Sequence, residues 1–125
     1  MMTTQEYLKA TWPLTLLLET KEQKMRPRVW CKDGFNISIQ ADKYTYCRPR
    51  ENGNITYHEV ELGYPSHPMP EFAEWGAGEN GETPSIWAYV PVLVVDVLLR
   101  AHGGIDHWGY FPEGYFPVNG GVLKI

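Results

Sequence analysis

A hairpin signal in residues 28–41 constrains the fold of this chain most strongly. The segment reads RVWCKDGFNISIQA, in which Asp33-Gly34 joins two runs rich in β-branched and aromatic residues. Asp-Gly between two such runs is among the strongest short-range signals of a β-hairpin. From Phe35 to Gln40 apolar and polar residues alternate, so one face of the second strand is buried and the other faces water.

Two more strands are expected to extend this hairpin. The segment KYTYCR, residues 43–48, is rich in β-forming residues and is followed by a proline, which cannot donate a hydrogen bond to a neighbouring strand. Asn52-Gly53 then predicts a turn into NITYHEVEL, residues 54–62, where side chains alternate between two faces. We therefore predict an antiparallel meander of four strands over residues 26–63.

A helix is expected before the meander and another after it. Thr3 and Glu6 match a capping box, which predicts a short helix over residues 4–11. The proline at position 13 is expected either to end this helix or to restart it, with another turn or two over residues 14–19. The segment VPVLVVDVLLRAHGG carries a proline in its first turn, an apolar stripe and two closing glycines. These features predict a second helix over residues 91–102.

The remaining segments complete an α+β fold in one domain, residues 1–125. Residues 63–85 are punctuated by prolines and glycines and predict a long loop, with one helical turn at 70–75. A short strand is expected at 85–90 and a last one at 122–125. The expected architecture is an antiparallel β-meander of four to five strands packed against the C-terminal helix, with a short N-terminal helix.

Composition excludes several classes of protein. The chain of 125 residues has an ordinary hydrophobic fraction of 43% and only two cysteines, too few for a disulfide framework. The apolar stretch WPLTLLLE is too short to span a membrane and lacks the basic start of a signal peptide. The histidines lack the spacing of a zinc site, and we expect no metal and no cofactor. We expect an intracellular protein with reduced thiols and no membrane partner.

Charge is unevenly distributed along the chain. The net charge is −4, but residues 21–50 carry eight basic and three acidic side chains, a net +5, and the rest carries −9. Such asymmetry is typical of an anion-binding face. The alternative is an exposed hairpin whose solvent side carries lysines and arginines.

The segment YTYCRPREN, residues 44–52, raises the question of a reactive cysteine. A thiolate at Cys47 needs a nearby cation and a base. If 43–48 is a strand, Arg48 points to the face opposite Cys47, so we expect Cys47 to be a core residue. Cys31 is expected to be buried in the same way.

The arginines and tyrosines of this stretch are the stronger functional candidates. A guanidinium group forms a planar fork for phosphate or carboxylate, and a tyrosine ring can stack on a ligand. The alternative is a solvated strand end whose arginines pair with Glu51 or Glu59. The candidate ligand- or partner-binding residues are Gln40, Tyr44, Tyr46, Arg48 and Arg50, with Tyr64 and Ser66 from the following loop.

A second hypothesis is enzymatic. Glu59 and Glu61 share one face of the predicted strand, about 7 Å apart, and His58 lies beside them in sequence. Such a pair would suit a small hydrolase or a nucleotide-modifying enzyme acting near the arginines. Alternating glutamates are also common on exposed sheet faces, so we assign no catalytic residue.

The C-terminal tail is the other candidate interaction surface. It contains GYFPE followed by GYFPV, two short repeats that hold rings in extended chain. Either the rings pack back on the sheet or they dock on a second chain, which would make a homodimer or an oligomeric virion or assembly component. The tail residues concerned are Trp108, Tyr110, Phe111, Tyr115 and Phe116.

Residues 29–105 resemble a group of short bacteriophage and prophage proteins. The motifs shared, in this order, are Cys-x-Asp-Gly-Phe, Ser-x-Gln-Ala, Tyr-Cys-x-Pro-Arg, Val-Glu-x-Gly-x-Pro-Ser and Val-Pro-Val. The resemblance implies a phage or prophage origin but no chemistry. We therefore expect a non-enzymatic accessory protein in the bacterial cytoplasm that binds a host protein or a small anionic, nucleotide-like ligand. Nucleic acid itself is not the expected partner.

Overall fold

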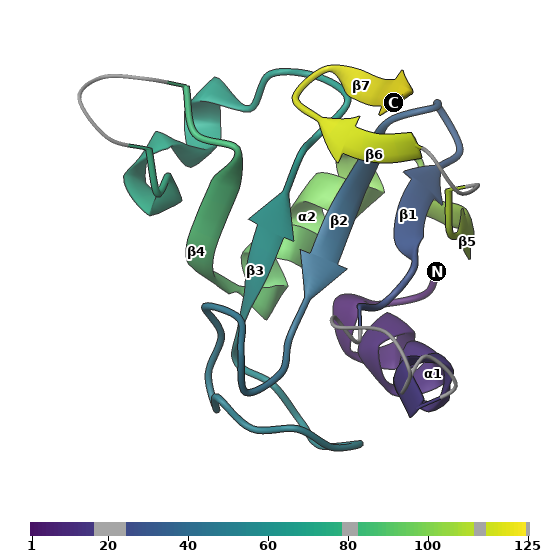
Figure 1. Cartoon of the computed structure of the whole chain (residues 1–125), viewed down its shortest axis with the longest axis vertical. Helices are drawn as coiled ribbons and strands as arrows, with labels where there is room; N and C mark the ends of the chain where they lie inside the picture. Colours follow the sequence, from purple (N-terminus) through teal and green to yellow (C-terminus); the bar gives the residue numbers. More distant parts are fainter. Residues whose placement is uncertain (17–24, 79–82, 112–114, 125) are drawn as a thin grey trace.

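The fold is a five-stranded antiparallel sheet with helices, as the α+β prediction requires (Figure 1). The computed structural model describes residues 1–16, 25–78, 83–111 and 115–124. The elements are α1 (Thr4–Leu16), β1 (Arg28–Cys31), β2 (Asn36–Gln40), β3 (Glu59–Gly63), the 3₁₀ helix η1 (Pro70–Trp75), β4 (Ile86–Pro91), α2 (Val92–Ala101), β5 (Ile105–Gly109), β6 (Tyr115–Val118) and β7 (Gly121–Lys124).

Strands β1 to β4 form the meander and β5 joins it at the far side, giving the order β4-β3-β2-β1-β5. The Asp33-Gly34 turn is confirmed: Gly34 has φ 95° and donates its N–H to the Cys31 carbonyl. A positive φ costs glycine little, which explains its place at this position. β5 was not predicted, because its polar, half-exposed sequence becomes a strand only through its pairing with β1.

The core lies between the sheet and α2, which is behind the sheet in Figure 1. Val95, Leu98 and Leu99 of α2 are buried against the alternating apolar residues of β1 to β3. Full burial of side chains of this size stabilises the fold by about 1.5–3 kcal/mol each. The predicted apolar stripe and glycine stop of this helix are confirmed, since α2 ends before Gly103-Gly104.

Helix α1 begins as predicted and continues further than predicted. Thr3 and Glu6 form the capping box, with N···O distances of 3.0 and 3.2 Å. Of the two outcomes expected at Pro13, the helix does not end there, because α1 runs through this residue to Leu16. A proline inside a helix removes one backbone hydrogen bond, and the buried face of α1, anchored at Tyr7, holds the helix together across it.

One strand prediction in the meander was wrong, and another was too long. Residues 43–46 form turns and bends, in which Asp42 Oδ1 accepts the Tyr44 N–H at 2.7 Å, and only Arg48 forms an isolated β-bridge, with Glu59. Aspartate bonding to the backbone two residues ahead competes with strand formation. Of the strand predicted over 54–62, only Glu59–Gly63 forms a strand, and the residues before it belong to the same long loop.

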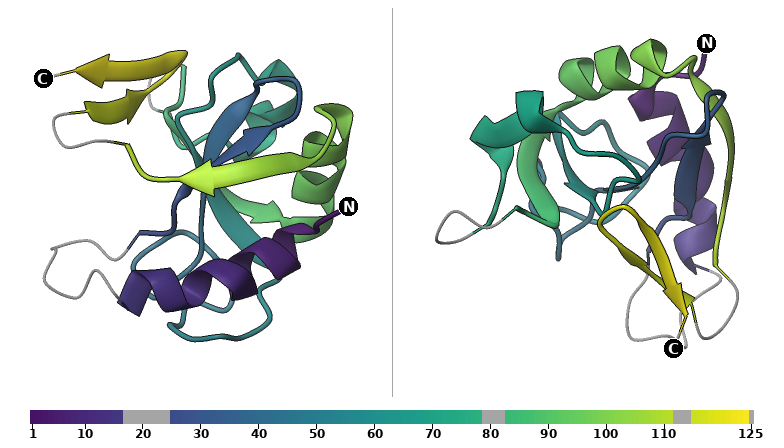
Figure 2. Two further views of the ribbon diagram at one scale, coloured as in Figure 1. Left: turned by 90° about the vertical axis from the view of Figure 1, so that its right-hand side faces the viewer. Right: turned by 90° about the horizontal axis from the view of Figure 1, so that it is seen from above.

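The two faces of the sheet are covered differently. Figure 2 shows α2 on one face and the β6–β7 hairpin across part of the other. The hairpin is tied to the body of the protein by the Gly120 N–H, which donates to the Pro65 carbonyl, and by Asn119, which donates to the Pro84 carbonyl. On its second face the β2–β3 pair carries the polar side chains of Ser38, Gln40 and Glu61. No helix among the described residues is long and apolar enough to cross a membrane.

Candidate functional site

A hollow of about 690 Å³ opens on the polar face of the sheet. This volume lies in the range of small-molecule and side-chain binding pockets, about 300–1,000 Å³. The hollow is formed where β2 and β3 meet the end of α1 and the 42–52 loop. Its lining residues are Trp12, Leu16, Met25, Ser38, Gln40, Asp42, Lys43, Tyr44, Thr45, Asn52, Glu61, Gly63, Tyr64 and Ile86.

The floor of the hollow is polar because it is the second face of an alternating sheet. Ser38 pairs with Gly63 and Gln40 with Glu61 across the β2–β3 ladder. The floor residues are held by this ladder, so their positions are set by the most regular part of the fold.

Gln40 is part of the floor, but its amide is fully used inside the protein. Its Oε1 accepts the Arg26 backbone N–H at 2.8 Å, and its Nε2 donates to the Arg26 carbonyl at 2.9 Å and to Ser38 Oγ at 3.0 Å. The side chain is 3% exposed. The predicted grouping of Gln40 with the arginines was wrong, because the residue pairs with the backbone of another segment.

Three aromatic residues form the walls. Trp12 comes from α1, Tyr44 from the 42–52 loop and Tyr64 from the segment after β3. Tyr44 is 76% exposed, whereas Tyr64 has a φ of 50°, an uncommon value for a residue with a Cβ. The Tyr64 conformation is supported by its carbonyl, which accepts from the Arg28 guanidinium. Exposed aromatic side chains, and aromatic residues with a strained backbone, are typical of binding sites.

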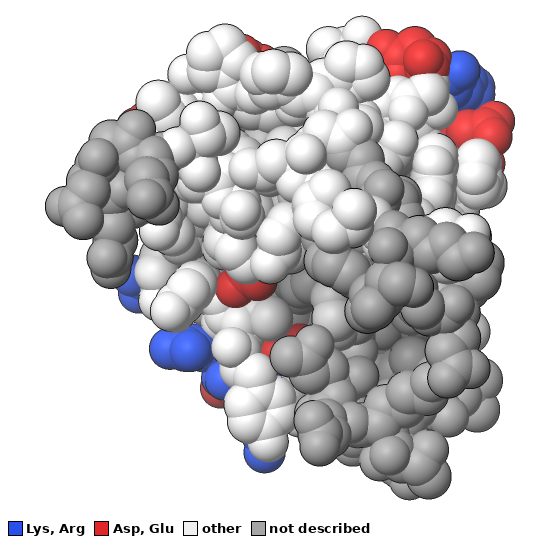
Figure 3. Space-filling view, turned by 45° about the horizontal axis from the view of Figure 1, so that its top comes forward, with Lys and Arg blue, Asp and Glu red and all other residues white. Residues whose placement is uncertain are grey.

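The charged residues of the hollow are two carboxylates, Asp42 and Glu61, and one ammonium group, Lys43. In Figure 3 acidic side chains lie in the recessed middle of this face, while basic side chains lie along its lower left margin. Glu61 is half-buried, and burial is the main cause that raises its pKa. The Tyr46 N–H, which donates to Glu61 Oε2 at 2.9 Å, lowers that pKa, and the neighbouring charge of Asp42 raises it. The hollow therefore contains two like charges that repel each other.

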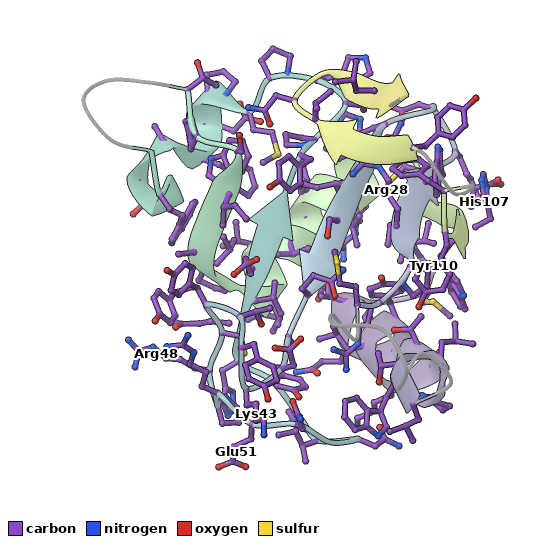
Figure 4. The ribbon with its side chains drawn as sticks, viewed as in Figure 1. Arg28, Lys43, Arg48, Glu51, His107 and Tyr110 are labelled. Atoms are coloured by element: carbon purple, nitrogen blue, oxygen red, sulfur yellow. The ribbon has the colours of Figure 1, made fainter. Side chains whose placement is uncertain are left out.

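The predicted arginine residues lie outside this hollow, in a separate arginine–tyrosine cluster of Arg48, Arg50, Tyr46 and Tyr89. Arg48 lies 4.8 Å above the Tyr89 ring and Arg50 lies 5.4 Å above the Tyr46 ring. The two rings are 5.9 Å apart. Figure 4 shows Arg48 pointing away from the sheet. Tyr44 therefore does not share a face with Tyr46 and Arg48, because the strand that would align them does not form.

Arg48 also forms an ion pair with a glutamate, which was the alternative to a ligand-binding role in the sequence analysis. Its Nε lies 2.8 Å from Glu59 Oε1, so Glu59 rather than Glu51 is its partner. An exposed ion pair of this kind stabilises a fold by about 0.2–1 kcal/mol. Arg50 forms no ion pair with any carboxylate in the described part of the chain.

Tyr89 could not be found from the sequence. It sits at a β-bulge, where two residues of β4 face Glu61 between the Val60 and Leu62 pairs. Its φ of 55° turns its N–H toward the Tyr46 carbonyl, at 3.0 Å. A bulge of this kind redirects a side chain, but it has no local sequence signal here.

Cys47 is a core residue, as predicted, although the strand argument for it was wrong. The side chain is 1% exposed, and its Sγ donates to the Asp42 carbonyl at 3.0 Å. Burial raises the pKa of the Cys47 thiol, and it raises the pKa of the Cys31 thiol to about 11. Both thiols are therefore protonated at neutral pH and are poor nucleophiles.

The residues of the enzymatic hypothesis are not gathered in one cavity. Glu61 lines the hollow, Glu59 pairs with Arg48, and the exposed His58 is not among the lining residues. Ser66, another candidate, also lies outside the hollow, where its Oγ accepts the Asn36 N–H at 2.9 Å. No group of three or more potential metal ligands occurs within the ranges that the structure describes.

Three tail aromatics pack within the chain. The Trp108 ring lies 5.7 Å from Tyr7 and the Phe111 ring 5.8 Å from Trp30. Tyr110 donates to the Met25 carbonyl at 2.7 Å, and Figure 4 shows it beside β5. Tyr115 is 40% exposed on the β6–β7 hairpin, and the Phe116 side chain lies outside the described part of the structure. A dimer through this tail stays a prediction.

Comparison with known proteins gives no further guide. No protein-family model, no curated protein and no solved structure matches this chain. Function is therefore argued from the geometry of the site.

Proposed function

We propose that this chain is a non-enzymatic binding protein and that the hollow on the polar sheet face is its binding site. The observation that supports this most is the combination of a volume of about 690 Å³ with a rigid polar floor and aromatic walls. Binding pockets typically combine such walls with a few polar groups placed by secondary structure. The resemblance to phage proteins adds the expectation that the partner is a host protein, met in the bacterial cytoplasm.

A titration followed by ¹H–¹⁵N NMR tests this proposal. The probes are small water-soluble aromatic and polar compounds in neutral, anionic and cationic forms. Binding in the hollow should shift the amide signals of Ser38, Gly63 and Tyr64. Tyr44→Ala should weaken these shifts. The matched control is Tyr46→Ala, which removes an exposed tyrosine outside the hollow and should leave them unchanged. If no probe shifts the three amides, the hollow is not a binding site.

The arginine–tyrosine cluster is a second candidate site, for an anionic, nucleotide-like ligand. One observation favours it: the Arg50 guanidinium lies over a tyrosine ring and forms no ion pair with a described carboxylate. A guanidinium group stacked on a ring still presents its N–H groups to phosphate oxygens. Adenosine monophosphate is the test probe, and Arg48→Ala combined with Arg50→Ala should abolish its binding with little change in melting temperature.

A further inference from the structure

The hollow contains two carboxylates for which the described part of the protein provides no paired cation. Neither Asp42 nor Glu61 forms an ion pair there. Asp42 uses Oδ1 to accept the Tyr44 N–H, and Glu61 uses Oε2 to accept the Tyr46 N–H. Each carboxylate therefore retains one oxygen without a hydrogen bond from a described residue. Partly buried charges are usually paired, because removing them from water costs free energy.

The described basic side chains around the hollow contact backbone carbonyls or aromatic rings and form no ion pair with its carboxylates. Arg26 is buried, donates to the Leu8 and Ala41 carbonyls and lies 5.7 Å from the Trp12 ring. Lys43 lines the hollow, but its Nζ lies 5.0 Å above the Tyr44 ring.

Two arginines beyond the ends of the hollow form no ion pair with its carboxylates either. Arg28 donates to Asn36 Oδ1 and to the Tyr64 carbonyl, and Figure 4 shows it under β6. Arg50 is close enough to lower the pKa of Glu61, but this is the smallest of the effects on that pKa. Within the described ranges, the basic residues near the hollow therefore leave both of its carboxylates without an ion pair.

The walls of the hollow suit a cation as well. Trp12 and Tyr44, two of its aromatic residues, already attract cations, since Arg26 lies over the first and Lys43 over the second. The face of an aromatic ring attracts an ammonium or guanidinium group by about 0.5–2 kcal/mol. An anion, in contrast, would meet two carboxylates.

We infer that the hollow binds an organic cation, a guanidinium or ammonium group, between the carboxylates of Asp42 and Glu61 and the aromatic walls. This inference rests on the proposed function, because it specifies the ligand of the same hollow. For the hollow, a cationic ligand therefore takes the place of the anionic ligand expected from the sequence. The cation can come from a free small molecule or from a basic side chain of a protein partner.

Matched ligands test the inference. The N-acetylated forms of arginine amide and citrulline amide, called arginine amide and citrulline amide below, have nearly the same shape, but only the first carries a cationic group. Both are titrated into ¹⁵N-labelled full-length protein, and a pentapeptide with one central arginine, Ac-GGRGG-amide, forms a third arm. We expect arginine amide to shift the amides of Ser38, Gly63 and Tyr64 with a dissociation constant at least tenfold below that of citrulline amide. Tighter binding of the peptide would indicate a protein partner, and tighter binding of arginine amide a free small molecule.

Matched variants complete the test. Glu61→Gln keeps the acceptor for the Tyr46 N–H and removes the charge, so it should weaken binding of arginine amide at least tenfold. Asp42→Asn should act in the same direction. Glu59→Gln is the control, because Glu59 is on the same strand but outside the hollow, and its dissociation constant should stay within twofold of the wild-type value. A dispersed NMR spectrum establishes that each variant is folded.

The outcomes separate this inference from the proposed function. If neutral or anionic probes shift the hollow amides and arginine amide does not, the cation inference is wrong and the proposed binding site stands. Equal affinity for citrulline amide, or an unchanged affinity in Glu61→Gln, also overturns the inference. If neither arginine amide nor any other probe shifts these amides, both proposals fail.

Discussion

Replacement of Gln40 by methionine tests whether the polar floor is built as described. Methionine has a similar volume, so the change removes hydrogen bonds without opening a large cavity. It leaves the N–H and the carbonyl of Arg26 without partners, and each unsatisfied buried polar group costs about 1–3 kcal/mol. We therefore expect the free energy of unfolding to fall by about 2 to 6 kcal/mol, from a total of about 6 to 19 kcal/mol for a domain of this size.

Urea denaturation followed by tryptophan fluorescence measures this loss. With a slope of about 2 kcal/mol per molar urea, the midpoint should fall by about 1 to 3 M and the slope itself should not change. Glu61→Gln is the comparison, because Glu61 is the cross-strand neighbour of Gln40 and should not lose stability. A midpoint within about 0.3 M of wild type for Gln40→Met would refute the structural role of this side chain.

Further predictions concern stability, pH and reactivity. Glu61→Gln should raise the melting temperature at pH 7, because a carboxyl group whose pKa is raised by burial destabilises the folded state while it is ionised. The gain should shrink as the pH falls from the raised pKa toward the ordinary glutamate pKa and should be absent below it; a lower melting temperature at pH 7 would contradict this prediction. Asp33 has a lowered pKa, caused first by the hydrogen bond from the Phe35 N–H and next by the one from His102, so its contribution to stability is present above the ordinary aspartate pKa and is lost at lower pH. Asp33→Asn should therefore flatten the acid side of a stability–pH curve; parallel curves for the variant and the wild type would contradict this stabilising role of Asp33. Gly103→Ala should cost about 1–2 kcal/mol in urea denaturation, because the φ of 88° favours glycine; a cost near zero would be inconsistent with that backbone. Both cysteines should react with Ellman's reagent only after unfolding, because their burial keeps them protonated; rapid reaction of the native protein would show that a thiol is accessible.

The structure also changes how the tail should be tested for oligomerisation. A deletion that begins at Trp108 would remove part of β5, which is paired with β1 inside the main sheet. A deletion of residues 115–125 leaves this strand in place. If the tail joins two chains, light scattering should show a smaller species for this deletion, whereas an unchanged mass would exclude that role.

Local signals made much of the fold predictable. The capping box at Thr3, the turn at Asp33-Gly34 and the glycine pair after α2 each act over a few residues, and each forms as expected. The errors arose where side chains compete with regular structure. The carboxylate of Asp42 stabilises turns in a segment whose composition favours a strand, and contacts outside the helix decide that α1 continues past Pro13.

The candidate site was less predictable, because it is assembled from distant parts of the chain. Tyr44 and Tyr64 were found as exposed aromatic candidates, and both line the hollow. Trp12 was missed because its place depends on how α1 packs beside the sheet. Glu61 was noted only as one of two alternating glutamates, since its partial burial and its proximity to Asp42 follow from the β2–β3 register and the loop after β2.

The most direct test of the binding site is a map of intermolecular nuclear Overhauser effects between arginine amide and the full-length protein. If the hollow binds the cation, the methylene protons of the ligand should give cross-peaks to the ring protons of Trp12 and Tyr44. Cross-peaks only to Tyr46 and Tyr89 would place the ligand on the arginine–tyrosine cluster and would contradict the assignment of the hollow as the cation site.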